Sequence, residues 1–343
     1  MRTEIFINTI GCHAAGEVGE VIISGVQNIK GTSISLKSKF LMDNPDLRNL
    51  LLCEPRGGVY KHFNLILPPI NKKADFGWII MEPMFNPPMS GSNAICTTTV
   101  IFETGMKVMK EPISELILES PGGLIKTRAF CSNGKVNKVE VENLPSFVYQ
   151  RNINLEIPDL GVFKVDIVFG GDSFVIIDAK QLGFSLTENE ASDLVILGNK
   201  ITSAANEQVG FKHPSIKNWN HISFCQFTLP VYRDQKSRVV GKNAVVIKPG
   251  KIDRSPCGTG CSARMALLLD EGNLTHSDVF LGQSILGTEF ECRVKDTFTI
   301  KGTNYIIPLI SGSAWITGHH SYFKDPTDPF KHGYKLSDTW PNL

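Results

Sequence analysis

The chain has 343 residues, a formal net charge of +1, and a composition that is 42% hydrophobic and 20% charged. This length accommodates about two domains with ordinary hydrophobic cores. The scattered lysines and arginines argue against a nucleic-acid or membrane-surface partner. No apolar run reaches the roughly 18 residues of a membrane span, and the first residues lack a signal-peptide pattern. We therefore expect a cytoplasmic protein that binds neither membranes nor nucleic acid.

Taken in chain order, short alternating or β-branched apolar runs predict strands, and longer runs with helical spacing predict helices. The predicted strands are 4–9, 20–24, 63–67, 76–80, 116–118, 139–141, 165–169 and 244–247. The predicted helices are fewer, at 46–53, 94–103, 188–207 and 262–271. Because strands dominate, the pattern indicates the α+β class.

One short motif occurs twice. Ser90 and Cys257 each precede a glycine-containing turn and an apolar run, and each run ends at a glycine 15 residues later, at Gly105 and Gly272. We interpret each copy as a nucleophile-type side chain, a tight turn and a helix with a glycine stop. The first turn of such a helix offers N–H groups and a positive dipole end to an anion. Two such ends that face each other would hold a small carboxylate between Ser90 and Cys257, which suits proton chemistry at the adjacent carbon.

The repeat extends beyond this motif. A strand, a glycine-rich turn and a second strand are predicted in 6–23 and again in 165–177, about 160 residues apart, which agrees with the spacing of the motif copies. We therefore predict a duplicated domain, with 1–148 carrying Ser90 and 149–343 carrying Cys257. The polar, proline-rich tail after residue 318, counted with the second repeat, is expected to wrap the surface rather than form a third domain.

The eight cysteines are dispersed, so we expect buried free thiols rather than a disulfide framework. Cys257 and Cys261 are spaced like half of a zinc site, but no second half with matching spacing exists. The sequence therefore predicts no metal.

Cys257 is the strongest catalytic candidate, because a helix N-terminus lowers the pKa of a thiol. The alternative is a small residue that fills a tight turn. Ser90 matches Cys257 in the repeat, and its alternative role is an ordinary helix N-cap.

The roles of four further residues remain open at this level. Asp253, four residues before Cys257, pairs with a substrate ammonium or caps the turn. His221 begins a predicted strand, where a structural role is the commoner one. His13 and His62 are similar cases.

Residues 252–260, Ile-Asp-Arg-Ser-Pro-Cys-Gly-Thr-Gly, closely resemble the second catalytic motif of the proline racemase family. Residues 88–94, Pro-Met-Ser-Gly-Ser-Asn-Ala, resemble the first motif, and 12–17, 54–58, 170–174 and 315–318 resemble further signatures. The resemblance covers essentially the whole chain. It implies a diaminopimelate-epimerase-like fold, in which two similar pseudo-symmetric domains surround a central cleft.

The resemblance also implies chemistry without a metal or pyridoxal phosphate, and a homodimer. By the same resemblance, backbone N–H groups of Gly91, Ser92, Gly258 and Thr259 hold the substrate carboxylate. Asp253 and His221 would then line the site near the ring nitrogen of an imino acid.

One position departs from the family pattern, because racemases and most epimerases of the family carry cysteine where this chain has Ser90. A Ser–Cys pair resembles the subgroup that handles hydroxyprolines. We expect a trans-3-hydroxy-L-proline dehydratase that forms Δ1-pyrroline-2-carboxylate, with 4-hydroxyproline 2-epimerase side activity. The alternatives are a dedicated hydroxyproline 2-epimerase and, from another class, an inactive binding protein.

Overall fold

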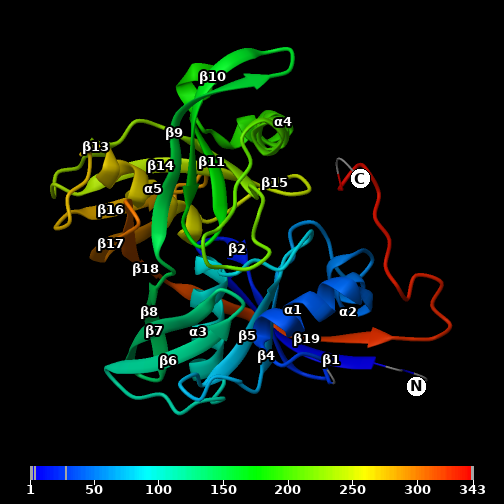
Figure 1. Ribbon diagram of the computed structural model, residues 1–343. Coiled ribbons are helices and arrows are strands. Elements are labelled where there is room, and N and C mark those ends of the chain that lie inside the picture. The colour runs from blue at the N-terminus through cyan, green and yellow to red at the C-terminus, as the bar shows by residue number, and fades with distance from the viewer. Residues whose placement is uncertain (1–2, 4, 28, 341–343) are drawn as a thin grey trace. The chain divides into compact units, whose positions relative to one another are not determined.

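The computed structural model describes residues 3, 5–27 and 29–340 (Figure 1). Within these residues the chain forms two compact units. The first unit contains the described residues up to Val141 together with those from Gly312 onward, and the second unit contains Glu142–Ser311. Among the described helices, none combines the length and the hydropathy that a membrane span requires.

The first unit is built on a mixed sheet in the order β19–β1–β3–β4–β5–β6–β7. The pairs β3/β4 and β5/β6 are parallel, and the other neighbours are antiparallel. The strands of this unit are β1 (Ile5–Ala14), β2 (Glu17–Val18), β3 (Glu20–Ser24), β4 (Phe63–Leu67), β5 (Phe76–Met81), β6 (Ile113–Ser120), β7 (Gly123–Ser132), β8 (Lys135–Glu142) and β19 (Ala314–Lys324).

Helix α3 (Gly91–Glu103) is the central helix of the first unit. Its residues from Gly91 to Phe102 are all buried, as expected for a helix enclosed on every side. It packs against β1 and β19 at one end of the sheet and against β7 near the other, so the sheet curves around it. Helices α1 (Ile34–Asp43) and α2 (Asp46–Leu52) contribute to a separate apolar cluster with side chains of β1, β3, β4 and β5.

The second unit is a closed mixed sheet. Its strands pair in the order β9–β10–β11–β12–β14–β16–β17–β18, and β18 pairs back onto β9. The bounds are β9 (Ser146–Ile157), β10 (Gly161–Phe169), β11 (Ser173–Asp178), β12 (Phe224–Thr228), β13 (Tyr232–Arg233), β14 (Val239–Ile247), β15 (Lys251–Ile252), β16 (Val279–Gln283), β17 (Glu289–Ile300) and β18 (Thr303–Gly312).

Two helices complete the second unit, together with the 3-10 turns Ala179–Leu182 and Glu188–Glu190. Helix α5 (Gly258–Asp270) is buried from Gly258 to Leu268 and packs on β9, β10 and β17, so it fills the closed sheet. Helix α4 (Ala191–Gln208) buries only one face, against β9, β12 and β14, and therefore covers the sheet from outside.

The predicted elements are present with small shifts at their ends. The strands predicted at 20–24 and 63–67 are β3 and β4 with the same bounds, and the four predicted helices correspond to α2, α3, α4 and α5. Residue 4 of the first predicted strand lies outside the described residues. Helix α1 was not predicted, because its buried face includes Ser38 between Ile34 and Leu41 and so lacks a continuous apolar stripe.

The division of the chain differs from the predicted boundary between 148 and 149. Strand β19 does not join the second unit, because it pairs antiparallel with β1 along the whole length of β1. The pair is visible in Figure 1 as the red C-terminal strand beside the blue N-terminal strand. The tail beyond β19 also packs on the first unit, where Arg56 forms an ion pair with Asp328 and Glu54 forms a β-bridge with Tyr334.

Candidate active site

The two copies of the motif have the local structure that the sequence predicts. Ser90 occupies the N-cap position of α3, and Cys257 occupies that of α5. Each helix is followed by its predicted glycine, and Gly105 and Gly272 both have a φ of 74°, in the left-handed region that glycine favours.

The first turns of the two helices provide backbone donors. The leading N–H groups of a helix have no acceptor within that helix, and they bind anions readily. In α3 these groups belong to Gly91 and Ser92, and in α5 they belong to Gly258 and Thr259; all four residues are buried. Each unit therefore contains a helix start whose leading N–H groups lie beside a nucleophile-type side chain.

A glycine allows α5 to lie close to its own sheet. A Cβ atom on Gly170 would lie 2.1 Å from the carbonyl oxygen of Thr259 and 2.4 Å from the backbone nitrogen of Ala263. Because both neighbours are backbone atoms of α5, no side-chain movement would relieve the clash. Gly170 therefore fixes the position of the first turn of α5.

Ser90 has N-cap backbone geometry, with φ −146° and ψ 124°, but its hydroxyl makes no capping hydrogen bond. Ser33 at the start of α1 shows the difference, because its Oγ accepts the N–H of Leu36 at 3.1 Å. The Oγ of Ser90 instead accepts a hydrogen bond of 2.9 Å from Nδ2 of Asn93. The hydroxyl is therefore not used in the way that a simple cap would use it.

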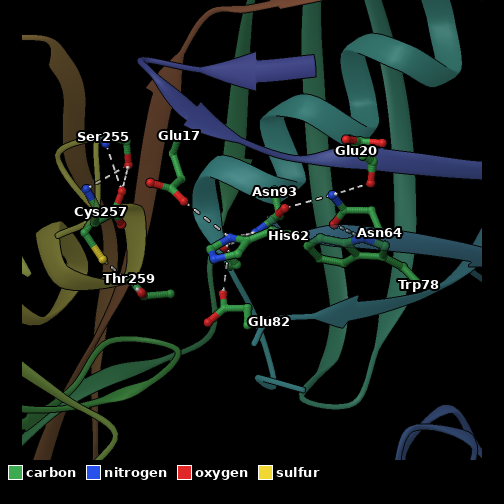
Figure 2. Close-up of polar contacts among 12 residues, drawn as sticks. Glu17, Glu20, His62, Asn64, Trp78, Glu82, Asn93, Ser255, Cys257 and Thr259 are labelled. Carbon is green, nitrogen blue, oxygen red and sulfur yellow. Dashed lines mark hydrogen bonds and ion pairs between the residues drawn. The ribbon is translucent and has the colours of Figure 1, made fainter. Parts of the chain in front are cut away.

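Asn93 belongs to a chain of buried side chains that leads to Ser90. Figure 2 shows three members of this chain, Trp78, Asn64 and Asn93. The indole Nε1 of Trp78 donates to Oδ1 of Asn64 at 2.9 Å, and Nδ2 of Asn64 donates to Oδ1 of Asn93 at 2.8 Å. Nδ2 of Asn93 also lies 3.3 Å from Nδ1 of His62.

His62 is not the isolated structural histidine that its sequence context suggests. Figure 2 shows its ring between the side chains of Glu17 and Glu82. Its Nδ1 lies 3.6 Å from Oε1 of Glu17 and 3.9 Å from Oε1 of Glu82, and all three residues are buried. The sequence signal for this cluster is weak: His62 directly precedes, and Asn64 lies within, an otherwise apolar strand.

Cys257 lies at a strained position. Its φ of 62° is in the left-handed region, which side chains other than glycine occupy at an energetic cost. The Sγ atom accepts the N–H of Gly260 at 3.3 Å and lies 3.5 Å from Oγ1 of Thr259. Strain of this kind is concentrated at functional sites, so the geometry favours a catalytic role over simple turn filling.

Asp253 stabilises the turn that leads to Cys257. Its Oδ1 accepts both the N–H and the hydroxyl of Ser255 at 2.8 Å, and Oγ of Ser255 accepts the N–H of Cys257 at 3.1 Å. Asp253 therefore caps the turn before Cys257, which is one of the two roles that the sequence left open. A contact of Asp253 with a substrate ammonium remains a proposal.

Comparison with known proteins identifies the family of this chain. The sequence model described as "Proline racemase" matches residues 9–335. The chain belongs to the proline racemase family. A hydroxyproline epimerase from Agrobacterium vitis, solved with bound trans-4-OH-L-proline, is 33% identical with a TM-score of 0.92, covering 99% of this chain and 98% of the other.

Two further solved structures are similar to this proline racemase family member, one closely and one in fold alone. A probable proline racemase from Agrobacterium radiobacter K84, with bound carbonate, is 34% identical with a TM-score of 0.91, covering 97% of this chain and 98% of the other. A PhzF-family phenazine biosynthesis protein from Bacillus anthracis is 11% identical with a TM-score of 0.57, covering 92% of this chain and 98% of the other. The last match shows likeness of fold alone.

The prediction of a lowered thiol pKa in this family member is wrong. Burial, and after it the charge of Asp253, raise the pKa of the Cys257 thiol well above its usual range. The hydrogen bonds from Thr259 and the Gly260 N–H oppose this rise without cancelling it. Desolvation therefore outweighs the hydrogen bonds at the helix N-terminus and favours the neutral form of the Cys257 thiol.

His221 and Asp172 both form hydrogen bonds with Ser173, the first residue of β11 in the second unit. The hydroxyl of Ser173 donates to the carbonyl of His221 at 2.6 Å, and the N–H of Ser173 donates to Oδ1 of Asp172 at 2.7 Å. Burial lowers the pKa of His221, assisted by the charge of Lys248. Burial raises the pKa of Asp172 to about 7, so this carboxyl titrates near neutral pH.

The described residues contain no group of three or more His, Cys, Asp or Glu side chains that could hold a metal ion. The eight cysteines are all buried free thiols, as predicted.

Proposed function

We propose that this proline racemase family member dehydrates trans-3-hydroxy-L-proline to Δ1-pyrroline-2-carboxylate, with Ser90 and Cys257 as the proton-transferring groups. The observation that carries this proposal is the pairing of a serine with a cysteine at two equivalent buried helix N-termini. A hydroxyl is a much weaker acid than a thiol, so the pair is poorly matched for reversible proton exchange on two faces of one carbon.

The carboxylate of the substrate is assigned to the backbone N–H groups of Gly91, Ser92, Gly258 and Thr259. Asp253 and His221 are assigned to the surroundings of the ring nitrogen. The bound trans-4-OH-L-proline of the Agrobacterium vitis relative supports an imino acid as the substrate class.

The first step of the proposed reaction is removal of the Cα proton by an enzyme base. Charge then builds on the carboxylate oxygens, where preorganised N–H donors stabilise it. The electron pair forms a C2–C3 double bond while the C3–O bond breaks, and the departing hydroxide takes up a proton to leave as water. In trans-3-hydroxy-L-proline the Cα hydrogen and the hydroxyl share one ring face, so a single residue can take the proton and return it to the leaving group. The resulting enamine tautomerises to Δ1-pyrroline-2-carboxylate without a cofactor.

A second candidate function is 4-hydroxyproline 2-epimerisation, either as a side activity or as the main reaction. The similarity over nearly the whole chain to the hydroxyproline epimerase favours it. Epimerisation requires both groups to act as acid and base in turn, which places a heavier demand on Ser90.

We also propose that the two units descend from one duplicated domain of the diaminopimelate-epimerase type, and that the protein is a homodimer. The same succession of antiparallel and parallel pairs in β1–β3–β4–β5–β6–β7 and in β10–β11–β12–β14–β16–β17 supports the duplication.

Incubation with proline, trans-3-hydroxy-L-proline and trans-4-hydroxy-L-proline in deuterated water, followed by NMR, tests the proposal. We expect pyrroline-2-carboxylate from the 3-hydroxy compound, slower inversion of the 4-hydroxy compound, and little racemisation of proline. Fast inversion of trans-4-hydroxy-L-proline without any dehydration would establish the epimerase instead. No Cα exchange with any of the three would identify a binding protein.

A further inference from the structure

The hydrogen-bond chain that ends at Ser90 has only one possible direction. The indole N–H of Trp78 is a donor and cannot accept, so the atom of Asn64 that faces it must be the carbonyl oxygen Oδ1. The amide nitrogen of Asn64 then faces Asn93, and the atom of Asn93 that receives it must also be an oxygen. One indole therefore fixes the orientation of two buried amides.

The same logic assigns the other end of the Asn93 side chain. Since its oxygen faces Asn64, its NH₂ group faces Ser90 and His62 and donates to Oγ of Ser90. Oγ of Ser90 is therefore an acceptor in this contact.

We propose that Asn93 is a positioning residue that activates Ser90, and that Asn64 and Trp78 hold Asn93 in the required orientation. This inference rests on the proposed function of Ser90. A hydrogen bond donated to Oγ favours the charged form of the hydroxyl and so lowers its pKa. Because Oγ accepts from Asn93, the proton of Ser90 is left for the substrate side.

Within the described part of the chain, no basic side chain is hydrogen-bonded to the Ser90 hydroxyl. Among the described residues, the only side-chain partner of the Ser90 hydroxyl is Nδ2 of Asn93, which cannot take a proton. His62 contacts Asn93 rather than Ser90, and an amide nitrogen does not pass a proton between them. Donor stabilisation by Asn93 and by the N-terminus of α3 is therefore the means by which Ser90 acquires acid–base activity.

The first experiment measures this activation without relying on turnover. In the Ser90→Cys variant, the pKa of the introduced thiol is obtained from the pH dependence of its alkylation by iodoacetamide, with peptide mapping to separate it from the eight native cysteines. Adding Asn93→Ala should raise that pKa by about one unit, which is about a tenfold loss of reactivity at fixed pH. An unchanged thiol pKa would overturn the inference.

Two further variants separate activation from packing. Trp78→Phe keeps an aromatic ring but deletes the indole donor, and it should raise the thiol pKa by less than Asn93→Ala does. If Asn93→Ala does not fold, Trp78→Phe tests the inference in its place. Asn86→Ala is the matched control, because Asn86 is a buried amide of the first unit that contacts Arg48 and Ser38 instead. It should leave the thiol pKa unchanged, and an equal shift would show that the effect is general to buried amides.

Kinetics then distinguish failure of this inference from failure of the proposed function. In the enzyme with Ser90, Asn93→Ala should lower kcat at least ~10-fold with little change in KM, and in a Ser90→Ala background it should have no further effect. Full turnover by Ser90→Ala would overturn the proposed role of Ser90. The pKa of the thiol in the Ser90→Cys variants would still show whether Asn93 lowers the pKa of the group at position 90. Equal losses from Asn93→Ala in both backgrounds would overturn the positioning role alone.

Discussion

The replacement Asp172→Asn tests whether a buried carboxyl in the second unit is protonated in the folded protein. Asp172 is 1% exposed and lies in the turn between β10 and β11. Burial raises its pKa from 3.8 to about 7, against the opposing hydrogen bonds from Ser223 and Ser173. Asparagine resembles the protonated carboxyl and retains the oxygen that accepts the N–H of Ser173.

The sign of the effect follows from proton binding. Between about pH 4 and pH 7, the folded state keeps the Asp172 proton that the unfolded state releases, so the free energy of unfolding falls as the pH rises. A difference of about three pKa units at 1.36 kcal/mol each gives an upper limit of about 4 kcal/mol. This contribution is fully present below pH 3.8 and is lost as the pH passes through about 7.

The assay is urea unfolding of the wild type and of Asp172→Asn at pH 5 and pH 8. The comparison between the two proteins cancels the other titrating groups, including His213, whose pKa burial lowers to about 4. We expect the wild type to lose at least about 2 kcal/mol relative to the variant over this range, half of the upper limit. If the difference between the two proteins is the same at both pH values, Asp172 is ionised in the folded state and the reasoning fails.

Three further predictions concern the site. Cys257→Ser should lower turnover at least ~100-fold, whereas Cys131→Ser, at an equally buried thiol, should leave steady-state kinetics nearly unchanged. Equal losses in the two variants would show that Cys257 is not a catalytic residue. Ser90→Cys should raise the rate of inversion of trans-4-hydroxy-L-proline relative to dehydration of trans-3-hydroxy-L-proline, as followed by NMR. An unchanged ratio of these two rates would show that Ser90 takes no part in proton transfer. Gly170→Ala should destabilise the fold by about 1–3 kcal/mol in denaturant unfolding, because its Cβ would meet the carbonyl oxygen of Thr259, and an unaltered midpoint would contradict that packing.

The local features of both units could be predicted from the sequence because their signals are contiguous. The position of Ser90 and Cys257 at helix starts follows from the adjacent turn residues, and the helix ends follow from Gly105 and Gly272. Strands β3 and β4 follow from short apolar runs between polar segments.

The environment of Ser90 could not be predicted in the same way. Asn64 lies in β4, Trp78 in β5 and Asn93 in α3, so their contacts exist only after the sheet has formed around the helix. Nothing in the spacing of these residues along the chain indicates that they meet.

The thiol pKa was predicted in the wrong direction for a related reason. A helix N-terminus is visible in the sequence, but the burial of the side chain it acts on is not. For Cys257, burial and the charge of Asp253 together outweigh the helix end.

The pairing of β19 with β1 has a consequence for synthesis of the chain. The second unit is one uninterrupted segment, so all of its residues are present before β19 is translated. The first unit, although β1 is made before any residue of the second unit, lacks β19 until the whole second unit has been translated. Until then one edge of β1 presents unpaired N–H and C=O groups, which are a template for pairing with other chains. On the ribosome, the unit that begins first is therefore completed last.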